Sequence, residues 1–296
     1  MANTQLVRSL IDAGVHFGHR TSRWNPKMKP YIYGKRNLIH IIDVRETLKG
    51  ILAAERFLKM LVGSGRDVLF VGTKRQARAV IDDVGKLTGM PVVTERWLGG
   101  TLTNYRTIRS RLKRLEELES TLQSPDVNKK FSKKMESSLK REYRKILRNL
   151  AGIRNMDRLP GAVFVVDVRR EEIAIKEARK LGIPVIGIID TDSDPDMVDI
   201  AIPGNDDALR AIDLILKEIS AAVLEGKSGR VAKEDKENTE AAKEGRTEGR
   251  TPRPRGRPRR DAEASEKPAP AADAPTASSG AETPAGEAQP AVNANG

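Results

Sequence analysis

The sequence of 296 residues predicts an α/β protein in which helices cover a doubly wound, mostly parallel sheet. Three observations support this prediction. Short runs rich in Val and Ile alternate with amphipathic stretches over most of residues 1–225, which is the pattern of successive βαβ units. Two long helical patterns interrupt the alternation at residues 104–151, and apolar residues become scarce after residue 225. We therefore expect an α/β core, an inserted helical hairpin and a disordered C-terminal tail.

The strands and helices of the core follow one another in a regular order. Short apolar runs predict buried strands at residues 38–42, 67–71, 91–93, 162–166, 184–189 and 200–202. Amphipathic stretches predict the intervening helices at residues 47–61, 74–87, 171–181 and 206–224. Gly182, followed by Pro184, fits a helix that stops and leads into the next strand. This order favours a Rossmann/flavodoxin-like fold.

The interruption at residues 104–151 has the pattern of a two-stranded antiparallel coiled-coil hairpin. Apolar residues recur every three or four positions over 108–122 and again over 131–150, and the segment 124–128 separates the two patterns. Each pattern has one narrow apolar stripe, with Lys or Arg on most other faces. Helices of about 20 residues would project roughly 30 Å from the core.

The predicted organisation has three parts. The α/β core, with a basic N-terminal arm, takes residues 1–103 and 152–225, and the hairpin takes 104–151. From residue 226 no aromatic residue, Ile, Leu or Met follows, and half of the 16 prolines fall there. Such a segment cannot bury enough apolar surface to offset its chain entropy, so residues 226–296 are predicted to be a disordered tail rich in Pro, Ala, Glu and Arg.

Charge is unevenly distributed along the chain. The 53 Lys and Arg outnumber the 41 Asp and Glu, which gives a net charge of +12 and a pI near 9.9. Residues 1–60 carry +7 and residues 101–160 carry +9, whereas residues 161–225 carry −7. A basic end and an acidic end are expected of a protein that binds nucleic acid through one face.

Composition also excludes several classes of function. The absence of cysteine excludes disulfides, cysteine-based zinc sites and a cysteine nucleophile. The start of the chain lacks the apolar region of a signal peptide, and no apolar run is long enough to span a membrane. We therefore expect a cytoplasmic protein with no membrane partner.

Three motifs offer chemistry at the ends of predicted strands or in the arm. The segment 71–75, which holds Lys74 and Arg75, lacks the glycines of nucleotide-binding loops and is interpreted as a basic loop for RNA phosphates. The Asp-rich segment 190–196 fits turn and N-cap roles, with a Mg²⁺ shared by Asp190 and Asp206 as the alternative. The pair His16 and His19 has no third ligand, which favours packing or RNA contact over zinc.

No arrangement of Ser, His and Asp and no carboxylate pair is positioned for catalysis. The sequence therefore predicts no enzyme, no catalytic residue, no metal, no cofactor and no small-molecule substrate.

Residues 23–36 interleave aromatic residues with Lys and Arg, a composition that stacks on bases and pairs with phosphates.

Five phrases, in this order, carry a resemblance to a known family: AGVHFGH at 13–19, FVGTKRQA at 70–77, RWLGGTLTN at 96–104, DTDSDP at 190–195 and IPGNDDA at 202–208. The chain resembles the bacterial small-subunit ribosomal protein two, the S-two family, over about residues 3–224. The resemblance implies an α/β domain with a helical-hairpin insertion that binds 16S rRNA near the junction of the head and body. It also implies neighbouring small-subunit proteins as partners, including the large mRNA-binding ribosomal protein one. The long tail departs from the short ending usual in the family.

We therefore predict a structural constituent of the small (30S) ribosomal subunit that acts in translation and binds RNA through phosphates and shape. The candidate RNA-binding residues are Arg20, Arg23, Lys27, Lys29, Lys35, Arg36, Lys74, Arg75, Arg96, Arg106, Arg109, Arg111, Lys113, Arg114, Lys133, Lys134, Arg141, Arg144 and Lys145. Two alternatives remain open. One is a nucleotide-binding enzyme, and the other is a DNA-binding protein that uses the AT-hook-like segment 254–258 of the tail.

Overall fold

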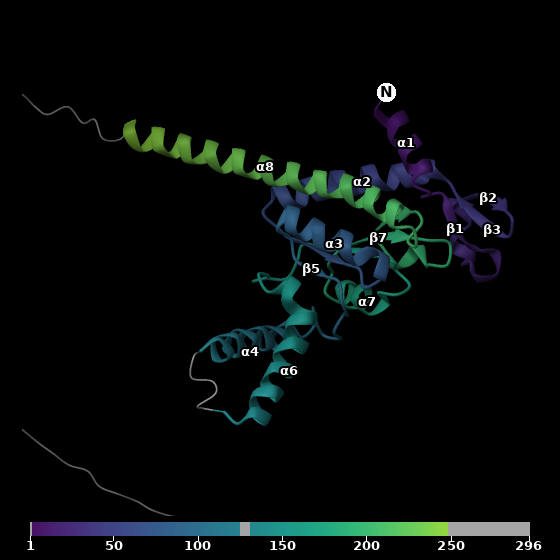
Figure 1. Ribbon diagram of the computed structural model, residues 1–296. Helices are drawn as coiled ribbons and strands as arrows, with labels where there is room; N and C mark the ends of the chain where they lie inside the picture. Colours follow the sequence, from purple (N-terminus) through teal and green to yellow (C-terminus); the bar gives the residue numbers. More distant parts are fainter. Residues whose placement is uncertain (1, 125–130, 248–296) are drawn as a thin grey trace, which may run out of the picture. The chain divides into compact units, whose positions relative to one another are not determined.

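The computed structural model describes residues 2–124 and 131–247 (Figure 1). Its centre is a parallel sheet of five strands, in the spatial order β5 (Val92–Val93), β4 (Val68–Val71), β6 (Ala162–Val166), β7 (Val185–Ile189) and β8 (Ile200–Pro203). In chain order this is 2-1-3-4-5, the flavodoxin-like doubly wound arrangement. The predicted fold class and the predicted strands of this sheet are confirmed.

One predicted strand lies in a different sheet. The run at 38–42 forms β3 (Ile39–Ile42), which pairs antiparallel with β1 (Phe17–Arg20) and β2 (Ile32–Arg36) in a separate three-stranded sheet. Burial alternates along β3, whereas every residue of β4, β6 and β7 is buried. Alternating burial is typical of an antiparallel sheet with one exposed face, so the prediction of a fully buried strand at 38–42 was wrong.

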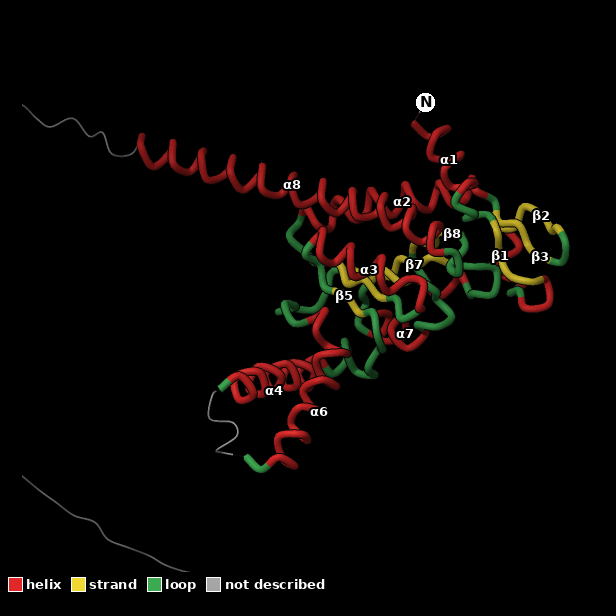
Figure 2. Tube along the Cα trace, viewed as in Figure 1, coloured by secondary structure: helices red, strands yellow, loops and turns green. Residues whose placement is uncertain are grey.

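Helices cover both faces of the parallel sheet (Figure 2). One core cluster joins α2 (Val44–Gly63), α3 (Arg75–Thr88) and α8 (Leu209–Thr247) to alternate strand residues such as Phe70 and Phe164. The second cluster joins α7 (Glu172–Lys180) and the start of α4 (Tyr105–Gln123) to the other residues of β4, Leu69 and Val71. The period of two along β4 thus divides its side chains between two hydrophobic cores.

The remaining helical segments precede or connect these elements. Helix α1 (Ala2–Asp12) opens the chain, and the short 3-10 helices η1 (Thr21–Arg23) and η2 (Pro26–Tyr31) lie between β1 and β2. Two further 3-10 helices, η3 (Ala151–Ile153) and η4 (Pro195–Met197), follow α6 and precede β8. Gly182, with a φ of 68°, lies just beyond α7, which confirms it as a helix stop.

The inserted segment contains the two predicted helices, α4 (Tyr105–Gln123) and α6 (Lys133–Leu150). They contact each other through pairs such as Arg114 Nε and Glu142 Oε1, 3.3 Å apart. A coiled coil is not confirmed. Helix α4 buries four apolar side chains, whereas α6 buries Leu139 and Leu150, and the helix axes are clearly inclined to each other in Figure 2.

Helix α8 extends beyond the predicted end of the core. It continues through Gly226 to Thr247, past residue 226, where the tail was predicted to begin. Gly226 lies against α2, where an added Cβ would meet Val62 and the carbonyl oxygen of Lys59, and this close approach explains why a glycine stands inside the helix. The next residues are rich in Ala, Glu and Lys, which have high helix propensity. The remaining predicted tail, with the segment 254–258, lies outside the described residues.

Candidate functional site

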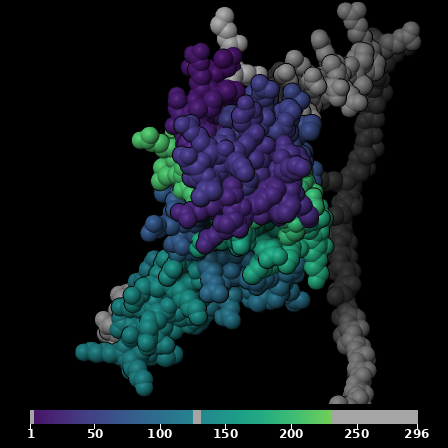
Figure 3. All heavy atoms as spheres, turned by 90° about the vertical axis from the view of Figure 1, so that its right-hand side faces the viewer, coloured from purple at the N-terminus to yellow at the C-terminus, as the bar shows by residue number. Residues whose placement is uncertain are grey.

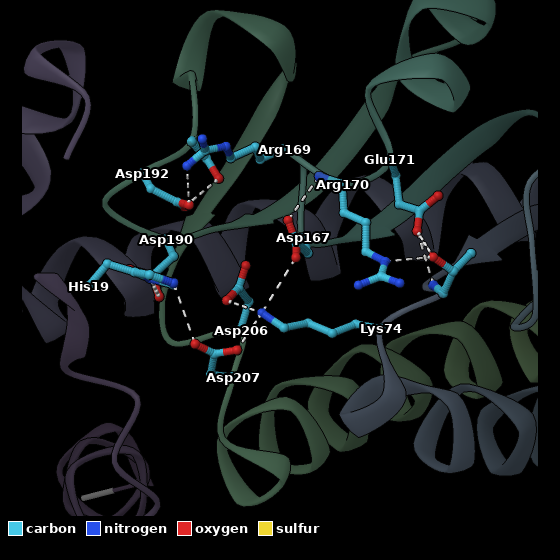
Figure 4. A network of polar contacts seen from close by, with 12 residues as sticks. His19, Lys74, Asp167, Arg169, Arg170, Glu171, Asp190, Asp192, Asp206 and Asp207 are labelled. Atoms are coloured by element: carbon cyan, nitrogen blue, oxygen red, sulfur yellow. Dashed lines mark hydrogen bonds and ion pairs between the residues drawn. The ribbon is translucent and has the colours of Figure 1, made fainter. Parts of the chain in front are cut away.

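The carboxyl ends of the parallel strands bring together a network of charged side chains (Figure 4). Lys74 follows β4, Asp167 follows β6, Asp190 follows β7 and Asp206 follows β8, while His19 enters from β1. In doubly wound folds this edge is where ligands bind. We call this group, together with Asp207, the edge cluster.

Lys74 lies at the centre of the edge cluster. Its Nζ is 2.7 Å from Asp206 Oδ1, 2.7 Å from Asp207 Oδ1 and 3.4 Å from Asp167 Oδ2. The Lys74 side chain is 11% exposed and that of Asp206 is 1% exposed. Burial, together with the charges of Asp167 and Asp190, raises the pKa of Asp206 to about 7 even though Lys74 opposes the shift. Lys74 is thus bound inside the domain, although its sequence position suggested a loop open to phosphates.

His19 joins the other side of the edge cluster. Its Nδ1 lies 2.8 Å from Asp190 Oδ2, and its Nε2 lies 3.4 Å from Asp207 Oδ2. The hydrogen bond to Asp190 raises the pKa of His19 to about 9, against the opposing effect of burial. His19 is therefore a cation that two carboxylates hold at neutral pH.

The edge cluster also contains donors that could hold a divalent cation. Ligand atoms of His19, Asp206 and Asp207 lie within 4.8 Å of one another, a mixture of imidazole and carboxylate that suits zinc. The sequence proposed Asp190 and Asp206 as Mg²⁺ ligands, and the structure places both in this cluster. The ring of His16 instead contacts the ring of Phe17, so the two histidines lie in different environments.

The Asp-rich loop after β7 has the predicted turn chemistry at Asp194. Its carboxylate accepts the backbone N–H of Asp196 and caps the short helix η4. The same carboxylate pairs with Lys27 Nζ at 2.8 Å, and Asp196 pairs with it at 2.6 Å. The predicted N-cap role is confirmed at this position, and the loop also ties down the N-terminal arm.

A second contact lies between β4 and β6, where the direction of strand addition reverses. The backbone N–H and the hydroxyl of Thr73 both donate to Glu171 Oε1, at 3.0 and 2.5 Å. Burial raises the pKa of Glu171. In a nucleotide-binding domain, N–H groups at this point would bind phosphate. Here a carboxylate takes the Thr73 N–H, which argues against the nucleotide-binding alternative.

The loop 96–104 is organised around one buried carboxylate. Glu177 of α7 accepts hydrogen bonds from the Trp97 indole and from the backbone N–H groups of Gly100, Leu102 and Thr103. Burial alone would raise the pKa of Glu177, but these bonds outweigh burial and lower it. Sequence analysis missed Glu177, although its position next to the apolar face of α7 was a signal.

Most of the candidate RNA-binding residues outside the edge cluster lie on the N-terminal arm or on the inserted helices, with Arg75 at the start of α3 and Arg96 in the loop after β5. Figure 3 shows the N-terminal arm, in purple, covering one face of the domain, and the inserted helices, in teal, projecting from it. Most of these side chains are exposed: Arg20, Arg23, Lys27, Lys29, Lys35, Arg36, Arg75, Arg96, Arg106, Arg111, Lys113, Lys133, Lys134, Arg141, Arg144 and Lys145. Arg109 and Arg114 are half-buried, and they pair with Asp157 and with Glu117 and Glu142. Sequence analysis omitted Arg148, which lies one helical turn after Arg144 and is 69% exposed.

These features define the class of the protein. It is a doubly wound α/β domain whose ligand crevice is crossed by its own hydrogen bonds and ion pairs, with a basic pair of helices inserted after the second strand of the parallel sheet. In the described part of the chain, no helix combines the length and apolar character needed to cross a membrane.

The sequence of this chain matches a family of known proteins. The family described as "Ribosomal protein S2" matches residues 10–226. The "Small ribosomal subunit protein uS2" of Rhodopirellula baltica is 55% identical over 244 residues, covering 82% of this chain and 93% of the relative. Those of Syntrophobacter fumaroxidans and Coprothermobacter proteolyticus are 51% and 48% identical, covering 75% and 80% of this chain and 80% and 88% of the relatives.

The chain therefore belongs to the ribosomal protein S2 family, and the resemblance found in its sequence is confirmed. It is a structural ribosomal protein that takes part in translation, and it is not an enzyme.

Proposed function

We propose that this protein is a structural constituent of the small (30S) ribosomal subunit and binds 16S rRNA near the junction of head and body. The observation that carries the proposal is the exposed cationic surface of the arm and of helices α4 and α6. Several of its cations, such as Lys29, Lys35 and Arg36, have no carboxylate within 4 Å among the described residues. A polyanion neutralises such a surface better than the protein's own acids.

The contacts are spread over many phosphates, so each side chain contributes a small share. Lys74 is left out of the interface because three carboxylates of the edge cluster surround its ammonium group. We also propose that residues 104–151 act as one RNA-binding module beside the core of 1–103 and 152–225. The protein would act in the cytoplasm, where translation takes place.

The test is sedimentation of tagged protein from gentle lysates at low and high salt, with sequencing of the RNA that accompanies it. Co-migration with small subunits that carry 16S rRNA, weakened by salt, is the expected result. Protein that sediments free of ribosomes at every salt concentration would contradict the proposal. A chain truncated after residue 247 should still associate, whereas the DNA-binding alternative predicts that binding to A·T-rich duplexes is lost with the tail.

The small antiparallel sheet favours a second role, support for attachment of the mRNA-binding ribosomal protein one. Tyr33, Leu38 and Phe17 are 80%, 76% and 47% exposed on or beside its strands. Large apolar side chains that are exposed on a small polar sheet are typical of a protein contact. The double variant Tyr33→Ser/Leu38→Ser should yield small subunits with normal 16S rRNA but less of that protein, as quantitative mass spectrometry would measure. Unchanged amounts would reject this role and leave rRNA binding untouched.

A further inference from the structure

Helix α6 and the loop before Trp97 enclose a cavity with an unusual lining. The cavity has a volume of about 500 Å³ and is lined by Arg96, Arg144, Lys145, Arg148 and Asn149. Four of the five side chains are cations, the fifth is an amide, and none is an acid. Every lining side chain can donate hydrogen bonds to an anion.

Two neighbouring cavities share lining residues with this one. A cavity of about 300 Å³ shares Lys145 and Asn149 with it and is also lined by Arg111 on α4 and by Glu142. Another, of about 380 Å³, shares Arg96 and Arg148 and is also lined by Arg170 and by two acids, Glu95 and Glu171. The three cavities are therefore adjacent, with the middle one free of acids, and we call them together the α6 groove.

Three of the four cations of the middle cavity have no acidic partner within 4 Å among the described residues. The side chains of Arg96 and Lys145 make no hydrogen bond or ion pair with any residue that the structure describes. Arg144 donates only to the backbone carbonyl of Lys140, at 3.2 Å. In contrast, Arg114 on α4 and Arg154 just after η3 each pair with glutamates. Clustered like charges repel one another, and an anion between them removes that repulsion.

Arg148 is the one cation of the middle cavity that the domain itself holds in place. Its Nε and Nη2 both lie 3.0 Å from Glu95 Oε2. The same oxygen accepts a hydrogen bond from Nη1 of Arg78, 3.2 Å away. Glu95 thus fixes the position of the Arg148 guanidinium on the wall of the groove, which reduces the entropy lost when a ligand binds.

We infer that the α6 groove binds the backbone of an rRNA strand and that its middle cavity takes a phosphodiester group. The inference rests on the proposed rRNA binding and names one place where it happens. Guanidinium groups bind phosphate oxygens with two parallel charge-assisted hydrogen bonds, and Arg96, Arg144 and Arg148 surround one space. The two adjacent cavities add Arg111 and Arg170, so cations extend beyond the space that a single free phosphate would fill.

The first test measures the salt dependence of binding to transcribed 16S rRNA. The variant Arg96→Gln/Arg144→Gln should weaken binding at least tenfold at moderate salt and reduce the slope of log K against log salt by about 1, because both side chains contact the same phosphodiester group. The matched control Arg56→Gln/Arg210→Gln removes two exposed charges from α2 and α8 and should change the slope little. Melting curves establish that both variants are folded.

The second test locates the RNA. The chain has no cysteine, so Asn149→Cys provides a single attachment point for Fe(II)-EDTA in the groove. In reconstituted small subunits, hydroxyl radicals from this position should cleave one local stretch of 16S rRNA, whereas Arg56→Cys on α2 should not cleave that stretch. Inorganic phosphate, added at constant ionic strength, should not displace the RNA.

Each outcome separates the inference from the proposed function. A folded Arg96→Gln/Arg144→Gln variant with an unchanged slope, or no cleavage from position 149 in intact subunits, overturns the groove as an RNA site and leaves rRNA binding elsewhere. Displacement of RNA by inorganic phosphate would assign the middle cavity to a free anion. Failure of the unmodified protein to bind 16S rRNA above competitor RNA would overturn the proposed function itself.

Discussion

Replacing Lys74 with methionine tests whether the edge cluster holds the domain together. Methionine keeps most of the volume of lysine and removes its charge. In Lys74→Met, Asp206, which is 1% exposed, loses an ammonium group 2.7 Å away and still faces the charges of Asp167 and Asp190. Its carboxylate then stays buried without its strongest cationic partner.

The expected cost follows from the burial of each partner. Removing one member of a buried ion pair typically destabilises a protein by about 3–5 kcal/mol, because the remaining charge is not solvated. Asp207 is 55% exposed, so water replaces most of what it loses. Most of the cost therefore comes from the buried Asp206, with a smaller share from Asp167, which is 14% exposed and 3.4 Å from the Lys74 Nζ. We therefore expect a loss of about 3–5 kcal/mol in the free energy of unfolding at pH 8.

The penalty should depend on pH. The pKa of Asp206 is already about 7, and removal of Lys74 raises it further. A carboxyl group whose pKa is raised by folding stabilises the folded state at low pH and loses that contribution as pH rises through the raised pKa. The difference between Lys74→Met and the unmodified protein should therefore shrink between pH 8 and pH 6. The free energy of unfolding of the double variant Lys74→Met/Asp206→Asn should differ little from that of the unmodified protein at both pH values.

The assay is urea unfolding of the full chain, followed by circular dichroism at both pH values. Lys86→Met on α3 is the matched control, because Lys86 is 77% exposed and its partner Asp83 is 75% exposed. It should change stability by no more than about 0.5 kcal/mol. A Lys74→Met variant within about 1 kcal/mol of the unmodified protein at pH 8, or equally destabilised at pH 6 and pH 8, would refute this account of the edge cluster.

Three further predictions concern other parts of the fold. The ionised His19 contributes about 1–3 kcal/mol to stability; this contribution is fully present below the ordinary pKa of 6.5 and is lost as pH rises through about 9. The free energy of unfolding, measured from pH 6 to 9.5, should therefore decline in the unmodified protein, and His19→Asn should lack this decline. Glu177→Gln should destabilise the protein by about 2–4 kcal/mol in chemical denaturation, because an amide nitrogen replaces one of the two oxygens that accept hydrogen bonds from the 96–104 loop. A loss no larger than that of an exposed substitution would show that Glu177 does not organise this loop. Gly152→Ala should cost about 1–3 kcal/mol by thermal melting, because its Cβ would collide with the carbonyl of Val92, and an unchanged melting temperature would mean that η3 moves freely away from β5.

The parallel sheet could be predicted from sequence because its strands are buried on both faces. Runs such as 162–166 and 184–189 are apolar at almost every position, and no other element of an α/β domain requires that pattern in so few residues. The run at 38–42 has a similar composition, but its partners β1 and β2 are short and contain Gly, His and Lys. Local composition therefore placed it in the wrong sheet.

The edge cluster could be predicted only in part. Parallel strands end at one edge, so the sequence correctly placed Asp190 and Asp206 together. It could not show that Lys74 would turn inward, because that depends on a hydrogen bond to Asp206, 132 residues away in the chain. Charge alone does not distinguish a lysine that binds carboxylates from one that is free for phosphate. The α6 groove was partly visible for the same reason: the helix spacing groups Arg144 and Arg148, but only the fold brings Arg96 to them.

The edge cluster and the α6 groove together explain how an enzyme-like fold serves a structural role. In doubly wound proteins the carboxyl edge of the sheet is the usual ligand site, and the N–H groups and charges there are left for the ligand. In this chain Glu171 takes the Thr73 N–H, and Asp206 takes the Lys74 ammonium. Among the described residues, unpaired cations lie instead on the N-terminal arm, as at Lys35, and on and beside the inserted helices, as at Arg144 and Arg96. If the groove binds RNA as inferred, the usual ligand site of the fold serves stability here, and the insertion supplies a binding surface. Substitutions in the edge cluster should then lower the melting temperature. Substitutions in the groove should lower RNA affinity at unchanged melting temperature.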